Sequence, residues 1–192
     1  GVARAACEPT FDDVPCSHWA FRYVEALART GVASGCWASP PLFCPDSNVN
    51  RGQMAKFLCK AAGNTWLDRA SPTFADVPRT HPFFGWIERL ADTGSWGGSP
   101  PTSGCRTVLI WRYFCPKQSV TRAQMAKFLC AATGKTPLNR PTPTFSDVAT
   151  THPLYAWIER FTDAGSWGGA APSSGCAPTT FCPNSTVTRG SM

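Results

Sequence analysis

Three arginines stand at matched positions of this chain and could bind anionic or hydroxyl-bearing groups. Each follows a cysteine by seven residues, and together they are Arg51, Arg122 and Arg189. We expect each at the first position of a helix, where a cation is mildly unfavourable to the helix dipole. This cost indicates another use, because a guanidinium presents a planar fork of donors to a carboxylate or to hydroxyl groups. The alternative is an ion pair with a carboxylate of a neighbouring copy of the same repeated unit.

Tryptophans in the expected loops form a second set of candidate binding residues. They are Trp37, Trp96, Trp111 and Trp167. A flat indole can stack on the face of a sugar, but packing over a neighbouring loop is an equally good interpretation of so large a ring. The sequence therefore predicts a glycan-binding surface, whose candidates are the three arginines together with Trp37, Trp96 and Trp167.

Catalytic and metal-binding patterns are not evident. One histidine occurs in each copy of the repeated unit, namely His18, His81 and His152. A threefold metal centre is conceivable, but hydrogen bonding at a helix start is the favoured interpretation. No nucleophile is placed beside a base, so we expect no enzyme, no metal site and no cofactor. A single glycosylation sequon begins at Asn184 in a loop.

The cysteines predict a disulfide framework. There are ten of them, with no Cys-x-x-Cys pair, which indicates an oxidising compartment rather than a zinc ribbon or a redox centre. Eight bracket short loops in pairs, and we predict the bridges Cys7–Cys16, Cys36–Cys44, Cys105–Cys115 and Cys176–Cys182. Cys59 and Cys130 each end a Lys-Phe-Leu-Cys run on an expected helix. They could be two buried thiols or a Cys59–Cys130 bridge between neighbouring copies.

The composition narrows the class of protein. With 43% hydrophobic and 16% charged residues, the chain should be folded rather than disordered. No apolar run approaches the ~18 residues of a spanning helix, so no membrane span is expected. The net charge of +6 comes from basic residues that are spread along the chain and recur at matched positions. We expect no dense basic face, so nucleic acid is not a favoured partner. Such charge suits an anionic wall polymer or simply a soluble surface.

A unit repeated three times must position these residues. It opens with Phe-x-Asp-Val at Phe11, Phe74 and Phe145, which are 63 and then 71 residues apart. We predict copies at residues 1–66, 67–137 and 138–192. Each should hold a first helix, a long loop and a second helix, with neighbouring copies sharing a core.

The second helix of each copy has its own start signal. Thr121 and Gln124 are spaced as a capping box, in which each side chain bonds to the other residue's backbone, and Asn50 and Gln53 repeat the pattern. In the third copy the helix start is present at Thr188-Arg189, but we expect the second helix itself to be missing.

These motifs resemble the S-layer homology (SLH) domain in order and spacing. The likeness is carried by Phe-x-Asp-Val, by His18-Trp19-Ala20 and by Val-Thr-Arg-Ala-Gln-Met from Val120, and it extends over nearly the whole chain. It implies a mainly α fold, in which three tandem helix–loop–helix repeats form a pseudo-threefold bundle, here with disulfide-stapled loops and an incomplete third repeat. It also implies binding of pyruvylated cell-wall polysaccharide between repeats, with the family's arginine at Arg51, Arg122 and Arg189.

Two functional hypotheses follow. The first is a secreted, non-catalytic cell-surface protein that anchors to cell-wall glycan. The second is a self-assembling subunit of an extracellular filament or surface lattice, whose partners are copies of itself. In that case a helix or strand of a neighbouring subunit would complete the third copy.

Overall fold

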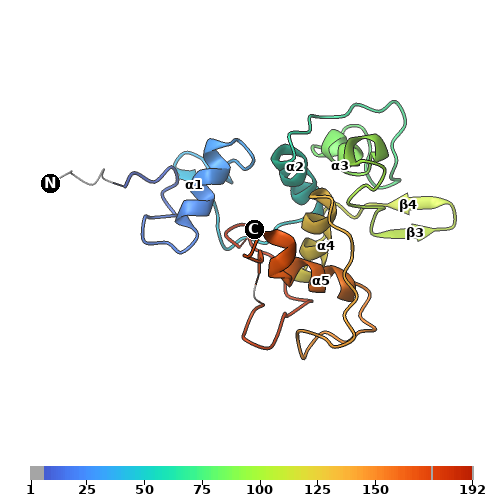
Figure 1. The fold of residues 1–192 in the computed structure, drawn as a ribbon. Helices are drawn as coiled ribbons and strands as arrows, with labels where there is room; N and C mark the ends of the chain where they lie inside the picture. Colours follow the sequence, from blue (N-terminus) through green and yellow to red (C-terminus); the bar gives the residue numbers. More distant parts are fainter. Residues whose placement is uncertain (1–6, 174, 192) are drawn as a thin grey trace. The chain divides into compact units, whose positions relative to one another are not determined.

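The computed structural model describes residues 7–173 and 175–191, which divide into two compact units (Figure 1). Of the described residues, unit 1 contains 7–49 and 188–191, and unit 2 contains 50–173 and 175–187. Both boundaries of unit 2 lie inside predicted copies, since the second helix of the first copy belongs to unit 2. The copy boundaries themselves stay a prediction.

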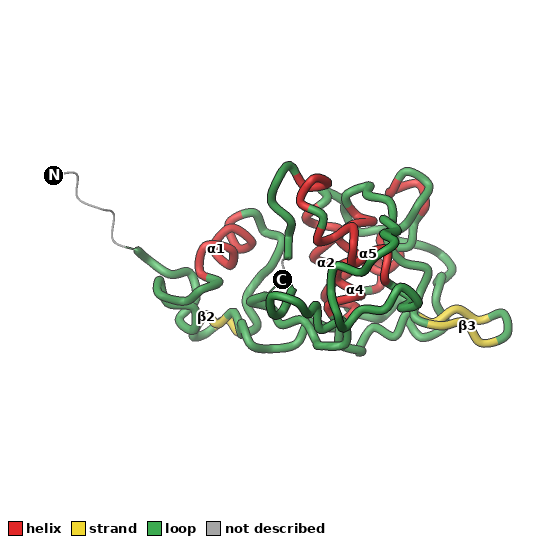
Figure 2. The backbone as a smooth tube through the Cα atoms, turned by 60° about the horizontal axis from the view of Figure 1, so that its bottom comes forward, coloured by secondary structure: helices red, strands yellow, loops and turns green. Residues whose placement is uncertain are grey.

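The helices and strands are short and are separated by long loops, as the colouring of Figure 2 makes clear. Unit 1 contains α1 (Phe21–Arg29) and a hairpin of β1 (Trp37–Ala38) and β2 (Pro41–Leu42). The elements of unit 2 are α2 (Arg51–Ala61), α3 (Phe84–Leu90), the 3-10 helix η1 (Thr93–Trp96), β3 (Arg106–Val108), β4 (Trp111–Tyr113), α4 (Arg122–Ala132), α5 (Tyr155–Thr162) and the 3-10 helix η2 (Ala164–Trp167).

The predicted start signals of the second helices are confirmed. At the start of α2, the Asn50 side chain accepts from the Gln53 backbone N–H at 2.9 Å, and the Gln53 side chain accepts from the Asn50 N–H at 3.0 Å. Thr121 and Gln124 form the same box at the start of α4. Within unit 2, α2 packs on α3 and α4 packs on α5, so the second helix of one copy covers the first helix of the next.

The aspartate of each Phe-x-Asp-Val motif holds the Phe-Cys segment of its own copy. The carboxylate of Asp76 accepts from the backbone N–H groups of Phe114 and Cys115 at 2.8 and 2.7 Å. Asp13 does the same for Phe43 and Cys44, and Asp147 for Phe181 and Cys182. A carboxylate that accepts two backbone donors makes charge-assisted bonds, which are stronger than neutral ones.

An arginine from another copy binds the same Phe-Cys segment from the other side. Its Nε donates to the phenylalanine carbonyl at 2.7 Å, and its guanidinium lies over the phenylalanine ring. The pairs are Arg51 with Phe114, Arg122 with Phe181 and, within unit 1, Arg189 with Phe43. We call each set of aspartate, phenylalanine and arginine an Asp–Phe–Arg lock. Because Arg51 and Arg189 are only 4% and 5% exposed, the locks are part of the interior.

A fully buried glutamate joins the long linker to the first helix. Glu88 on α3 accepts from the N–H and the hydroxyl of Thr73 at 2.8 and 2.5 Å, and Arg69 Nε lies 3.2 Å from its carboxylate. Glu159 on α5 has the equivalent partners in Thr144 and Arg140. Paired in this way, a buried charge can be accommodated in a core.

All four predicted disulfides are present. They are Cys7–Cys16, Cys36–Cys44, Cys105–Cys115 and Cys176–Cys182, with Cα–Cα distances of 6.2, 6.0, 5.9 and 6.0 Å. Cys59 and Cys130 are free and buried, so the alternative bridge between them is not formed. Burial raises the pKa of both thiols to about 12, which keeps them protonated and unreactive at neutral pH.

The predicted fold class is wrong. Only 29% of the structure is helical, and the described residues form two units rather than one pseudo-threefold bundle of three mainly helical repeats. The physical reason lies in the connections. The chain has 18 prolines and 16 glycines, which favour turns over helix, and its loops are held by disulfides and Asp–Phe–Arg locks instead of regular secondary structure.

Unit 1 differs from unit 2 in the cover of its first helix. Phe84 and Leu90 on α3 are buried under α2, whereas their equivalents Phe21 and Leu27 on α1 are only half-buried. Tyr23 is 65% exposed. Arg189 and Gly190 nevertheless make the same backbone bonds within unit 1 that Arg51 and Gly52 make within unit 2 at the start of α2. The described part of unit 1 therefore contains the start site of a covering helix but not the helix.

The Asp76 lock predicts a large stability difference between two aspartates. Asp76→Asn should lower the free energy of unfolding by about 2 kcal/mol, because the amide keeps one acceptor oxygen and turns a donor toward the second N–H. Asp68 is the matched control. It is exposed and pairs only with Arg79, so Asp68→Asn should change stability by about 0.5 kcal/mol or less. Urea denaturation measures both, and equal effects would contradict the role given to the lock.

Candidate functional site

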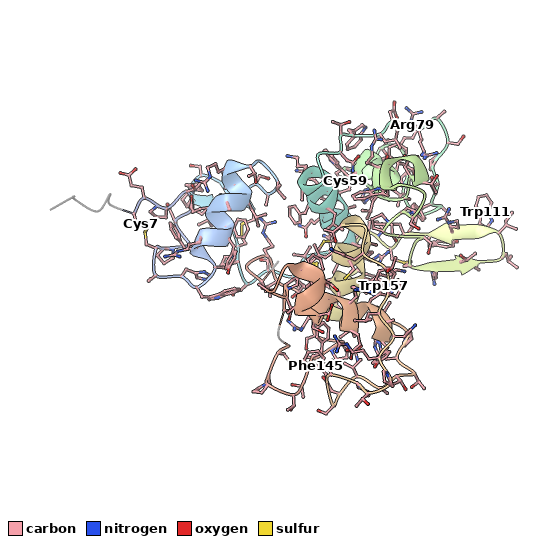
Figure 3. All side chains as sticks on the ribbon, in the orientation of Figure 1. Cys7, Cys59, Arg79, Trp111, Phe145 and Trp157 are labelled. Carbon is pink, nitrogen blue, oxygen red and sulfur yellow. A yellow bond between two sulfur atoms is a disulfide. The ribbon has the colours of Figure 1, made fainter. Side chains whose placement is uncertain are left out.

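A groove in unit 2 combines aromatic walls with unpaired positive charge. One part is a cavity of about 450 Å³, lined by Trp96, Lys127, Lys135 and Trp157 among others. A second cavity of about 310 Å³ shares four of its lining residues, Trp96, Gly97, Ala131 and Gly134. The two cavities therefore adjoin each other, and together we call them the Trp96 groove. Its walls come from η1, α4 and α5, and Figure 3 labels Trp157 on α5.

Trp96 is held in a fixed orientation. Its indole N–H donates to the carbonyl of Arg89 at 2.8 Å. The 3-10 helix that carries it is capped by Asp92, whose carboxylate accepts from the Ser95 N–H at 2.9 Å and from Arg69 at 2.6 Å. Because both the ring and its backbone are anchored, the ring is preorganised as a flat apolar wall.

The two lysines of the groove differ in their surroundings. Lys135 lies over the ring of Trp167, with its Nζ 5.6 Å from the ring centroid. Lys127 is half-buried, and among the described residues it has no hydrogen-bond, ion-pair or ring partner. Burial lowers the pKa of Lys127, and repulsion from Arg51 lowers it further. A bound anion would relieve both effects, so Lys127 is the strongest candidate for contact with an anionic ligand.

No aspartate or glutamate lines either cavity of the groove. Residues 93–146 carry seven of the 18 lysines and arginines, while all 12 aspartates and glutamates lie elsewhere. The basic charge is thus more localised than the overall count indicated. A groove without carboxylates keeps its positive potential, because no internal anion neutralises it.

The predicted arginines lie beneath the surface rather than on it. Arg51 donates to Phe114 and lies 3.5 Å from the Thr102 hydroxyl, and Arg122 donates to Phe181 and to Ser173. Arg189 bonds to Phe43 and Ser34 in unit 1. The alternative considered from the sequence was an ion pair with a carboxylate of another copy. Each arginine does bond to another copy, but its main acceptor is a backbone carbonyl rather than a carboxylate. Arg51 also adds charge behind Lys127.

The predicted tryptophans do not come together. Of the tryptophans predicted from the sequence, only Trp96 lines the groove. Trp167 packs edge-on against Phe161 at 6.1 Å between ring centroids, and its N–H bonds to Arg160. Trp37 lies exposed in unit 1, with its N–H bonded to the carbonyl of Ser39 at 2.9 Å. Asn184, the predicted glycosylation position, is exposed, and its modification stays a prediction.

The histidines act at helix starts, as favoured from the sequence. Nδ1 of His18, His81 and His152 each accepts from the backbone N–H two residues later at 3.1 Å. Burial is the main reason that the pKa of His81 is lowered, which suits a neutral ring acting as acceptor. The described residues contain no group of three His, Cys, Asp or Glu side chains placed to hold a metal ion.

Sequence reasoning missed Lys127, Lys135 and Trp157 as parts of one site. They come from two helices and a linker, and Trp96 comes from a fourth segment. The acid-free stretch from residue 93 to 146 was the available signal. It points to the correct region but cannot identify the side chains that meet.

The groove can bind an anionic saccharide by two ordinary interactions. The rings of Trp96 and Trp157 offer apolar faces for the C–H faces of sugar rings. The lysines offer charged donors for carboxylate or phosphate groups, and partial burial strengthens these interactions.

The S-layer homology domain family matches residues 10–36, which contain the first Phe-Asp-Asp-Val motif and α1. The resemblance drawn from the motifs is confirmed over this segment, and the four disulfides support a cysteine-rich variant. A search of the curated proteins found no match to the chain. SLH domains are non-catalytic, surface-anchoring domains. Together with the disulfides, the match points to a cell-surface or extracellular protein. None of the described helices is long and apolar enough to cross a membrane.

The Asp92 cap predicts that the groove loosens in acid. Hydrogen bonding from Ser95 is the main cause of a lowered pKa at Asp92, with burial opposing it and Arg69 and Arg89 assisting. The stabilisation is therefore complete above the unfolded pKa of about 3.9 and is lost as pH falls through the lower folded pKa. We expect the emission of Trp96, measured as wild type minus Trp96→Phe, to stay constant down to about pH 4 and to shift to longer wavelength below it.

Asp92→Asn provides the control for this titration. Its Trp96 emission should already be shifted at neutral pH, because the cap is weakened at every pH. An emission identical to wild type at neutral pH would show that Asp92 does not hold the groove wall.

Proposed function

We propose that this chain is a non-catalytic extracellular protein that attaches to anionic cell-wall glycan through the Trp96 groove. The observation that carries the proposal is the meeting of a fixed indole with a half-buried, unpaired lysine in a segment without carboxylates. Lys127 supplies the charge and Trp96 the apolar wall. The SLH match at residues 10–36 supports the surface-anchoring role.

The form of the groove favours a polymer over a single sugar. Its two cavities adjoin along Trp96, Gly97, Ala131 and Gly134, so a ligand can extend from one into the other. Binding sites of a few hundred Å³ fit small ligands or short segments of longer ones. A chain with one residue in each cavity would use both, and the rest of the polymer would remain in solvent.

The charge of the groove favours an anionic polymer over a neutral one. Lys127 and Lys135 line it, Arg51 lies behind, and desolvation makes an uncompensated cation unfavourable. A carboxylate or phosphate on the glycan would pair with Lys127 and remove this disadvantage. The arginines keep a candidate role in glycan binding, Arg51 by its charge and Arg122, which is half-buried, by direct contact.

Binding to purified anionic wall polysaccharide tests the proposal. Lys127→Ala should weaken binding about tenfold, because a charged hydrogen bond contributes roughly 1.5–3 kcal/mol. Trp96→Ala should weaken it by a similar factor through loss of the stacking face. Added salt should reduce wild-type affinity and have less effect on the Lys127→Ala variant. Isothermal titration calorimetry or polysaccharide pull-down measures these changes.

Lys117→Ala and Trp37→Ala are the matched controls. Lys117 is exposed and lies outside the groove, within the same acid-free segment, and Trp37 is an exposed ring in unit 1. Neither change should alter binding. If Lys117→Ala weakens binding as much as Lys127→Ala, the charge of the segment matters but the groove does not. If the wild type fails to bind anionic wall polysaccharide at all, the proposed function is wrong.

Self-assembly into a filament or lattice is a second candidate, and the α1 face of unit 1 favours it. Tyr23 is exposed, and Phe21 and Leu27 are half-buried, although the equivalent helices of unit 2 are covered by a second helix. A helix of a neighbouring subunit could cover α1, with the Arg189 lock marking where that helix starts. An apolar helix face left in solvent is a recognised interaction surface.

Sedimentation and electron microscopy of the pure protein test this candidate. Ordered polymers should form without glycan, and Tyr23→Asp should leave the protein monomeric, because a charge on α1 opposes apolar packing. Trp37→Asp, on the hairpin of the same unit, is the control and should still polymerise. A wild type that stays monomeric at high concentration would exclude self-assembly through α1.

A further inference from the structure

The β3–β4 hairpin carries an exposed apolar tip that the Trp96 groove does not use. We call residues 106–113 the apolar finger. Figures 1 and 2 both show it extending away from the helices of unit 2, and Figure 3 labels Trp111 on it. The exposed fractions of Val108, Leu109, Ile110 and Trp111 are 44%, 90%, 84% and 57%. Four adjacent large apolar side chains in solvent mark an interaction surface more often than chance exposure does.

The finger is held rigidly at its base. The Cys105–Cys115 disulfide closes it, and Asp76 fixes the backbone that follows it. Strand pairing joins Val108 to Trp111 across the tip. Arg112 donates to the carbonyl of Ser103 at 3.0 Å. The apolar side chains are therefore presented by an ordered scaffold.

Leu109 is doubly unfavourable at the tip. Its φ is +54°, in the left-handed region where glycine, asparagine and aspartate are preferred in tight turns. It also exposes a large aliphatic side chain to water. A polar turn residue would remove both disadvantages, so the sequence at this turn is explained by contact with an apolar environment rather than by hairpin formation.

The repeated unit does not require such a tip. In unit 1 the equivalent hairpin has only Ser39 and Pro40 between its strands. The equivalent turn of the third copy runs from Ala177 to Thr180 through Pro178 and Thr179. Neither carries three consecutive aliphatic residues, so the finger is an addition specific to the second copy.

Cations stand behind the apolar tip in a layered order. Val108, Leu109 and Ile110 form the tip and Trp111 follows. Toward the base, Arg106 is paired with Tyr113 and Arg112 with Thr107. Arg106 lies over the ring of Tyr113 at 4.8 Å. This order matches a bilayer, in which aliphatic side chains suit the acyl region, indoles suit the interface and arginines suit the headgroups.

We propose that the apolar finger inserts into the surface of an anionic lipid bilayer. The three aliphatic side chains enter the acyl boundary, Trp111 lies at the interface, and Arg106 and Arg112 bind headgroup phosphates. The acid-free segment 93–146 adds attraction to a negatively charged surface. A tip of this size anchors weakly by itself, so attachment needs apolar insertion and cation contacts together.

A second copy of this chain is a poorer occupant. It would have to offer an apolar recess with acidic rims. In the described part of unit 2, the Trp96 groove carries Lys127 and Lys135 instead, and docking the finger there would bring arginines against lysines. Another cavity is lined partly by Ile110, Trp111 and Arg112 of the finger itself. A fluid bilayer needs no matched recess, and its phosphates complement the arginines.

Cosedimentation of the full chain with lipid vesicles tests the proposal. The wild type should bind vesicles of phosphatidylcholine with phosphatidylglycerol, and bind phosphatidylcholine alone much more weakly. The double change Leu109→Asp with Ile110→Asp should reduce binding at least about tenfold, because it removes the apolar area that would be buried in the bilayer. Arg106→Ala should weaken binding only to the phosphatidylglycerol vesicles. Glycerol phosphate in solution should not compete, which separates a bilayer from a free phosphate group.

Three controls make the result decisive. Trp37→Asp places a charge on the hairpin of unit 1 and should leave vesicle binding unchanged. Near-ultraviolet circular dichroism should show that the finger variants fold, and glycan binding should survive in them because the groove is separate. Brominated lipids should quench wild-type fluorescence more than that of Trp111→Phe.

Two outcomes would overturn the proposal. One is vesicle binding that is absent in the wild type or unchanged in the Leu109→Asp, Ile110→Asp variant. The other is a wild-type oligomer that this variant dissociates, with no vesicle binding, which would assign the finger to contact between copies. Neither outcome bears on the Trp96 groove, whose test uses polysaccharide and different residues.

Discussion

The Asp–Phe–Arg lock is the interaction on which the rest of the structure depends. It binds one Phe-Cys segment from two sides, with a carboxylate on its N–H groups and a guanidinium on its carbonyl. Both bonds are charge-assisted, and the arginine is desolvated, so losing one partner would leave the other buried and unsatisfied. Long loops with little secondary structure can therefore hold a defined conformation. The disulfides act at the same points, because Cys44, Cys115 and Cys182 directly follow the locked phenylalanines.

The same lock organises both proposed binding surfaces of unit 2. Arg51 is drawn inside by Phe114, which places its charge beneath the groove and next to Lys127. Asp76 fixes the chain immediately after β4 and so steadies the base of the apolar finger. The same residue thus supplies a structural bond and a charge. Arg51, which the sequence offered as a ligand-binding side chain, bonds within the interior, and its charge acts on Lys127 in the groove.

The two surfaces suggest a division of tasks within a cell-surface protein. The Trp96 groove suits an anionic polymer, and the finger suits an anionic lipid surface, because the cations of both belong to residues 93–146, which carry no carboxylate. Unit 1 contains the SLH match and a first helix whose apolar face is less covered than those of α3 and α5. An apolar helix face left in solvent fits a protein contact better than a glycan contact.

The sequence by itself determined the features that depend on neighbours a few residues away. The capping boxes at Asn50 and Thr121, the histidine bonds at helix starts and the four short-range disulfides all follow from spacing, since each joins groups within about ten residues. The tertiary structure decided what lies across larger separations. Arg51 meets Phe114 at a separation of 63 residues, Lys127 meets Trp96 and Trp157 from three segments, and the helix pairs sort into two units rather than one bundle. Such contacts depend on how loops close and which side chains lose water together, and neither is encoded in local spacing.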